Sequence, residues 1–106
     1  MTVQYRLVTS YATTSAQAAD ENQSRIEAVF AELAETKPDN VSYLVLRLAD
    51  GSFLHVSFHG HGHEDANPIA GSAAFAEFQA KHGEIREGGV NQQEATLVGA
   101  YLTEIE

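Results

Sequence analysis

Residues 41–60, VSYLVLRLADGSFLHVSFHG, constrain the fold most strongly, because two runs of strand-forming residues flank a turn sequence. Asp50-Gly51 between apolar runs is a strong signal for a β-hairpin. With Gly51 in a left-handed bulge position, one face of the hairpin carries only apolar residues and the other carries both apolar and polar residues. A two-residue turn would instead distribute the apolar residues over both faces. We expect the bulge. The apolar face then carries Leu44, Leu46, Leu48, Leu54, Val56 and Phe58, and the mixed face carries Tyr43, Val45, Arg47, Phe53, His55, Ser57 and His59.

A strand and a long helix are predicted before the hairpin. Residues 3–12 are rich in Val, Tyr, Leu and Thr, which is typical of a strand. Beyond them, apolar residues recur at i, i+3, i+4 and i+7, which predicts a helix over 16–36. Ser15 or Asp20 is suited to cap its start, and Pro38 ends it near Thr36, because proline disfavours a helical residue before it. The apolar stripe consists of Ile26, Val29, Phe30 and Leu33.

The last third of the chain predicts one more helix and one more strand. A short helical stripe begins at Ala74 and is followed by Gly83, a suitable C-cap. Residues 87–94, EGGVNQQE, have the composition of a loop, and residues 95–105, ATLVGAYLTEI, that of a strand. The stripe consists of Ala74, Phe75, Phe78 and His82.

The predicted order is βαββαβ over a single domain, residues 1–106, which is a ferredoxin-like α+β arrangement with a four-stranded antiparallel sheet. Right-handed crossovers place both helices on one face of that sheet. The strands carry apolar residues on both faces, so the face without helices would expose a large apolar patch. We therefore expect a homodimer in which two sheets pack face to face.

Composition narrows the possible partners. The chain has 15 acidic and 6 basic residues and a formal charge of −9, which disfavours binding to nucleic acid or to an anionic membrane surface. It contains no cysteine, which excludes disulfides, thiolate metal sites and cysteine nucleophiles. No apolar run approaches the length of a membrane span, and the start of the chain does not resemble a signal peptide. A cytoplasmic location fits these features best.

The segment HGHGHED, residues 59–65, allows three interpretations. Its histidines could hold Zn²⁺ or a similar metal, they could bind substrate or transfer protons, or the segment could be a solvated connector. Gly60 and Gly62 make the backbone costly to order, which favours the connector. We assign no metal site. His55 and His59 nevertheless share a strand face, since side chains alternate along a strand.

Four residues of the mixed face are candidates for binding a ligand: Tyr43, Arg47, His55 and His59. His55 and His59 are also candidate catalytic residues, because the ordinary pKa of histidine lies near neutral pH. Each has a structural alternative. A buried histidine usually has a hydrogen-bond partner for structural reasons, a strand tyrosine is more often part of a core or interface, and a strand arginine such as Arg47 usually pairs with an acid.

Four sequence segments, spread over nearly the whole chain, resemble segments of a known family: ADENQSRIEAVFAEL at 19–33, SYLVLRLADGSFLHV at 42–56, NPIAGSAAFAEFQ at 67–79 and ATLVGAYL at 95–102. With the predicted architecture, they resemble the antibiotic biosynthesis monooxygenase-like superfamily of dimeric α/β barrels. That superfamily includes cofactor-free oxygenases of quinol-like aromatic substrates, haem-degrading enzymes and many small proteins of unassigned activity. The active branches use Asn, Trp and His, and this chain has no tryptophan.

The resemblance implies a pocket between sheet and helices that binds a small aromatic or otherwise apolar molecule and oxidises it without a cofactor. The alternatives are a non-catalytic dimeric module that binds a ligand or a protein, and a metal-binding protein built on the histidine segment. Turnover of a quinol-like substrate distinguishes the first from the second, and metal bound in stoichiometric amount identifies the third.

Overall fold

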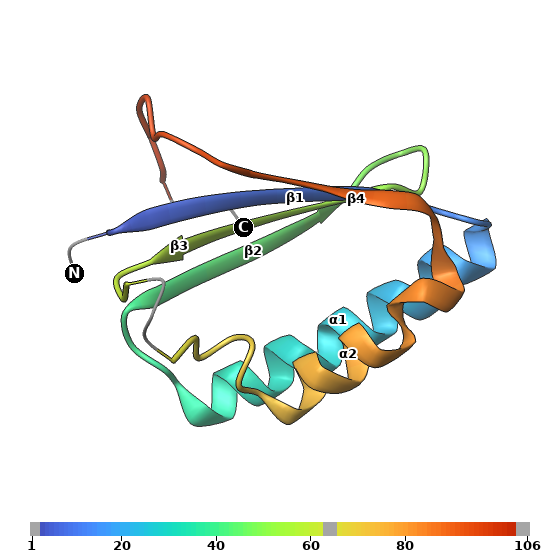
Figure 1. Ribbon diagram of the computed structural model, residues 1–106, viewed down its shortest axis with the longest axis horizontal. Helices are drawn as coiled ribbons and strands as arrows, with labels where there is room; N and C mark the ends of the chain where they lie inside the picture. The colour runs from blue at the N-terminus through green and yellow to red at the C-terminus, as the bar shows by residue number, and fades with distance from the viewer. Residues whose placement is uncertain (1–2, 63–65, 104–106) are drawn as a thin grey trace.

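The computed structural model describes residues 3–62 and 66–103. It contains four strands and two helices, which follow one another in the predicted order βαββαβ. The sheet order is β2-β3-β1-β4, and all three strand pairs are antiparallel. Both helices cover the same face of the sheet and lie side by side (Figure 1). The ferredoxin-like α+β fold is confirmed. The elements are β1 (Tyr5–Thr13), α1 (Ala16–Thr36), β2 (Val41–Arg47), β3 (Phe53–His59), α2 (Ala73–Ile85) and β4 (Arg86–Glu94).

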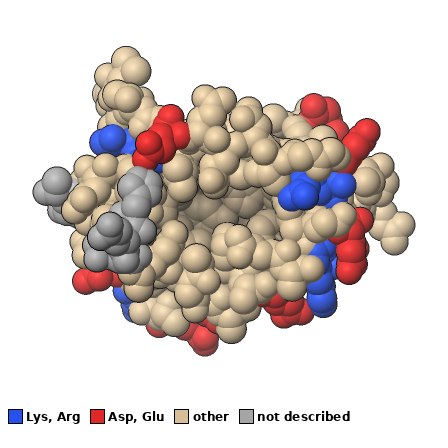
Figure 2. Space-filling model, viewed as in Figure 1, with Lys and Arg blue, Asp and Glu red and all other residues tan. Residues whose placement is uncertain are grey.

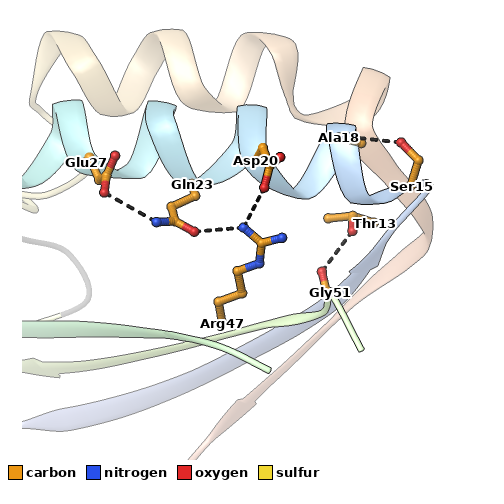
Figure 3. A network of polar contacts seen from close by, with 8 residues as sticks. All are labelled: Thr13, Ser15, Ala18, Asp20, Gln23, Glu27, Arg47 and Gly51. Atoms are coloured by element: carbon orange, nitrogen blue, oxygen red, sulfur yellow. Dashed lines mark hydrogen bonds and ion pairs between the residues drawn. The ribbon is translucent and has the colours of Figure 1, made fainter. Parts of the chain in front are cut away.

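Helix α1 has the bounds that its sequence predicts. Ser15 is the N-cap, and its Oγ accepts a hydrogen bond from the backbone N–H of Ala18 at 3.0 Å (Figure 3). The helix ends at Thr36, and Lys37 follows with a left-handed φ of 47°, directly before Pro38. Its inward face contributes Ile26 and Val29 to the core, which also contains Tyr11 and Phe53 of the sheet.

The hairpin has the predicted bulge and register. Gly51 adopts a φ of 87°, its N–H donates to the carbonyl of Leu48, and the N–H of Leu48 donates to the carbonyl of Ser52. Tyr43 therefore lies opposite Ser57, and Leu44 opposite Val56. The mixed face of the hairpin faces the helices: its residues Tyr43, His55 and Ser57 line the space between the sheet and the helices.

Two predictions about the last third of the chain are wrong. The polar residues 87–94, expected as a loop, belong to β4, which pairs with β1 along its length. Residues 95–103, expected as a strand, form no regular element and project from the sheet on the side away from the helices (Figure 1). Hydrogen bonding to β1 thus overrides a poor strand composition. Gly83 is not a C-cap either, because α2 continues to Ile85.

The face of the sheet without helices is apolar and open. Leu44, Leu46 and Leu48 are each about half exposed, at 47%, 50% and 45%. The segment after β4 adds Val98 and Tyr101, which are almost fully exposed. No helix in residues 3–62 and 66–103 is long and apolar enough to cross a membrane.

Gly51 and Gly83 provide a matched test of the turn and of the corrected helix end. Gly51→Ala should lower the free energy of unfolding by about 1 kcal/mol, because a side chain disfavours the left-handed backbone. Gly83→Ala should raise it by about 0.5–1 kcal/mol, because alanine is the better residue inside a helix and a Cβ there meets no atom within 4 Å. Urea denaturation of both variants measures the two effects. Destabilisation by Gly83→Ala would restore the C-cap assignment.

Candidate functional site

A pocket of about 430 Å³ lies between the sheet and the helices. Figure 2 shows the molecule hollowed there, with uncharged residues around most of the hollow. Strands β1 to β4, helix α2 and the turn before α2 all contribute to the wall. The apolar part of the lining includes Leu7, Ile69, Phe75, Phe78 and Val90, and the polar part includes Tyr11, Tyr43, His55, Ser57, His59, Asn67, Gln79, His82, Arg86 and Gln92.

His55 is the centre of a buried polar network at one end of the pocket. Its Nε2 lies 2.8 Å from the hydroxyl of Tyr11, and its Nδ1 lies 2.6 Å from the hydroxyl of Tyr43. Asn22 of α1, which is fully buried, donates its amide Nδ2 to the Tyr11 oxygen at 2.8 Å. Tyr11 therefore donates its own proton to Nε2, and neutral His55 donates from Nδ1 to Tyr43. The network joins β1, β2, β3 and α1.

Burial keeps this network uncharged. It lowers the pKa of His55 from 6.5 to about 4, and a charge on nearby His82 lowers it in the same direction. It raises the pKa of Tyr11 to about 12 and also raises that of Tyr43. At neutral pH the imidazole is therefore neutral and both phenols keep their protons, so the network supplies hydrogen-bond donors rather than charges.

A second chain of hydrogen bonds lies at the other end of the pocket. Ser57 Oγ is 2.7 Å from Nε2 of His59, whose Nδ1 is 2.9 Å from Nε2 of His61. Nδ1 of His61 lies 3.0 Å from the carbonyl oxygen of Gly62. His59 is 1% exposed, and Tyr5 stacks on its ring with centroids 4.3 Å apart. His59 and His61 are thus buried and hydrogen-bonded. His63, Glu64 and Asp65 lie outside the described residues.

The described residues hold no group of three or more His, Asp or Glu side chains placed to bind a metal ion. His59 Nδ1 and His61 Nε2 bond to each other, and their remaining ring nitrogens bond to Ser57 and to a backbone carbonyl. A metal would have to displace these bonds.

The pocket is free of carboxylates along its described lining, although the chain is strongly acidic. Arg86, at the start of β4, is the one lysine or arginine among those lining residues. Its Nη1 donates to Nδ1 of His82 at 3.1 Å, and its Nε donates to the carbonyl of Gly88. Burial and the charge of Arg86 lower the pKa of His82 to about 4. Arg86 is therefore the charged group that faces the pocket at this end.

Three of the four predicted ligand-binding residues line the pocket: Tyr43, His55 and His59. Arg47 does not. It bonds at 2.9 Å to Asp20 and at 2.9 Å to Gln23, both on α1, as Figure 3 shows. Arg47 thus lies outside this pocket and pairs with an acid, as its structural alternative describes, and binding of a ligand by Arg47 stays a prediction.

Sequence reasoning missed Tyr11, His82 and Arg86 as pocket residues. Tyr11 shares a face with the histidines because it pairs with Phe53 in the antiparallel register, and register between distant strands is not legible in one sequence. Arg86 was not identified because the strand that carries it was not predicted. The signal for His82 was present, since it lies one turn after Phe78 on the same helical stripe.

Comparison with known proteins supports the fold. No protein-family model matches the sequence, and no curated protein matches it. A candidate antibiotic biosynthesis monooxygenase from Caulobacter crescentus is similar in structure, with a TM-score of 0.70, 14% identity and 90% of each chain covered. PA3566 from Pseudomonas aeruginosa has a TM-score of 0.71 and 10% identity, and the match covers 93% of this chain and 98% of PA3566. SnoaB, a cofactor-independent oxygenase from Streptomyces nogalater, has a TM-score of 0.65 and 13% identity, and the match covers 93% of this chain and 97% of SnoaB. The fold is that of antibiotic biosynthesis monooxygenase-like proteins.

The low pKa of His55 makes stability depend on pH. In the unfolded chain its pKa returns to about 6.5, so between pH 6.5 and about 4 the unfolded state binds more protons than the folded state. The free energy of unfolding should therefore fall as the pH falls through this window, by up to about 3 kcal/mol from this residue. Urea denaturation at pH 7 and pH 4.5 measures the change.

A conservative variant serves as the control for this effect. His55→Gln keeps polar groups beside both tyrosines but does not titrate, so the dependence on pH should become shallower. NMR titration of the histidine rings gives an independent reading. A pKa near 6.5 for His55 in the folded protein contradicts the assignment.

Proposed function

We propose that the pocket binds a small hydroxylated aromatic molecule, quinol-like in character, and that the protein oxidises it with dioxygen without a cofactor. The observation that carries this proposal is the combination of apolar and aromatic lining residues, the lack of carboxylates among the described lining residues, and one arginine at the end of the pocket. The volume of about 430 Å³ lies within the range of small-molecule sites. Phe75 and Phe78, with ring centroids 5.6 Å apart and planes tilted by 38°, supply aromatic contacts for an aromatic body.

The polar groups suit an oxygen atom that bears negative charge. Arg86 stabilises a phenolate, and the hydroxyl of Tyr43 is a further donor, because it accepts from His55 and keeps its own proton for a ligand. A deprotonated quinol is electron-rich enough to reduce dioxygen. In the net reaction the ring carbon para to the hydroxyl becomes a carbonyl. One oxygen atom of dioxygen is retained there, and the other leaves as water with the hydrogen of that carbon and the hydrogen of the hydroxyl. His55 orients the two hydroxyls, because both its nitrogens are engaged and its pKa is low.

The likeness to SnoaB, described as a cofactor-independent oxygenase, supports oxidation as the chemistry at the level of fold only. The runner-up function is a non-catalytic module that binds the same kind of ligand. The two share the pocket and differ in whether dioxygen is consumed.

Binding is tested with 1-naphthol, whose fluorescence reports its surroundings. The wild-type protein should bind one molecule per chain, and Ala70→Trp should weaken binding about tenfold or more by filling the pocket wall. Ala80→Trp, the same change at an exposed position of α2 outside the pocket, should leave binding unchanged. Equal affinity in all three proteins contradicts binding in this pocket.

Catalysis is tested with a dioxygen electrode and a series of dihydroxynaphthalenes and anthrones. The wild-type protein should consume dioxygen in proportion to product, and Arg86→Gln should lower kcat by about 10- to 100-fold, because charge stabilisation at the phenolate is lost. Saturable binding without dioxygen uptake across the series would favour the non-catalytic module.

We also propose that the chain is a cytoplasmic homodimer joined through the open sheet face. A second copy would cover the half-exposed leucines Leu44, Leu46 and Leu48, which monomers rarely leave in water as one patch. Light scattering should give twice the chain mass of 11.5 kDa. Leu46→Asp should reduce it to a single chain mass, and Ala76→Asp, on the exposed side of α2, should not. A wild-type monomer at micromolar concentration contradicts the proposal.

A further inference from the structure

The hydrogen-bond chain at the β3 end of the pocket has a direction. A carbonyl oxygen only accepts, so His61 must donate from Nδ1 to Gly62, which leaves its Nε2 as an acceptor. His59 therefore donates from Nδ1 to His61 and accepts at Nε2. The group that donates to this nitrogen at 2.7 Å is the hydroxyl of Ser57.

This arrangement matches the requirements for an activated nucleophile. Such a site needs a hydroxyl within about 2.6–3.2 Å of a base, and a third group that orients the base. Ser57 and His59 meet the distance criterion and both line the pocket. His61 orients His59, and the stacked ring of Tyr5, tilted by only 8°, fixes its plane. We propose that Ser57 is an acyl-accepting nucleophile, with His59 as its base, for carboxylic esters of small apolar acids.

The reaction balances with water as the co-reactant. Ser57 Oγ bonds to the acyl carbon of the ester while its proton passes to His59 Nε2. The bond from the acyl carbon to the leaving oxygen then breaks, and the alcohol departs with that proton. Water repeats the sequence on the acyl-serine, releases the acid and restores Ser57. Nothing is oxidised or reduced.

The pocket suits a neutral ester better than a charged peptide. Leu7, Ile69 and Phe75 offer apolar contacts for the acyl group. Asn67 is a polar lining residue whose Oδ1 accepts from the backbone N–H of Ile69 at 3.0 Å, so the atom it retains for a bound carbonyl is its Nδ2 donor. An amide donor of this kind is what a developing oxyanion requires.

The first test is covalent labelling with a fluorophosphonate, a probe that reacts with activated serines. Mass spectrometry of the digested wild-type protein should locate the adduct on Ser57. Ser57→Ala should abolish labelling, and His59→Gln should slow it by about 100-fold or more, because the base is lost. Ser42→Ala, on the same sheet but on the face away from the pocket, should be labelled like the wild type. An unlabelled Ser57 in folded wild-type protein, or an adduct on another residue, overturns the proposal.

The second test separates the orienting role of His61 from a structural one. With 4-nitrophenyl butyrate, His61→Phe should lower kcat about tenfold and leave KM unchanged, because the substrate still binds but the base is misoriented. His61→Gln should recover part of kcat, since its amide oxygen occupies the position of Nε2 and can accept from His59. A rise in KM without a fall in kcat, or no recovery with glutamine, overturns this role.

The outcome is independent of the oxygenase proposal. Labelling of Ser57 and hydrolysis of 4-nitrophenyl butyrate need no dioxygen and are measured on the wild-type protein under nitrogen, whereas the oxygenase proposal is measured as dioxygen uptake with phenols. A wild-type protein without labelling or hydrolysis therefore contradicts the role of Ser57 alone, and one that binds 1-naphthol without dioxygen uptake contradicts the oxygenase proposal alone.

Discussion

The register of β3 between its two neighbours is the constraint on which the rest of the structure depends. β3 pairs with β1 on one side and β2 on the other, and Thr9, His55 and Val45 fall in one row across the three strands. Because side chains alternate along a strand, this row decides that the imidazoles of β3 face the helices and the leucines of β2 face away from them. The pocket, both hydrogen-bond networks and the apolar open face all follow from it.

The histidines at the two ends of the pocket differ in their hydrogen-bond partners. His55 has both nitrogens satisfied by phenols, so it holds other groups in place. His59 has a nitrogen that accepts from a serine hydroxyl, and that hydroxyl belongs to the pocket wall. We therefore assign the same residue type, four positions apart on one strand face, a structural role at one end and propose it as a base at the other. Burial alone does not separate the two roles, because His55 and His59 are both buried; the identity of the hydrogen-bond partner does.

Most of the fold was predictable from local patterns, and most of the site was not. The bounds of α1 follow from Ser15 and Pro38, and the hairpin register follows from Gly51, because these residues act on the backbone beside them. β4 was not predictable, since its residues become a strand through pairing with β1 rather than through their own preference. For the same reason the approach of Tyr11 to His55, 44 residues apart, has no local signal. His55 and His59 were identifiable as neighbours because they share one strand.

The buried amide of Asn22 has a mechanical consequence. It bonds α1 to Tyr11 of the sheet, and Arg47 adds a second polar link from β2 to Asp20. Polar bonds of fixed geometry resist sliding and rotation of a helix, whereas ring contacts permit small displacements. The contacts of α2 with the sheet include the rings of Phe78 on His55 and of His82 on Tyr11. The two helices are therefore joined to the sheet by different contacts: α1 by hydrogen bonds at Asn22 and Asp20, and α2 by ring contacts and the hydrogen bond of His82 to Arg86. A substitution at Asn22 removes a bond that orients Tyr11, whereas one at Phe78 changes the shape of the pocket wall.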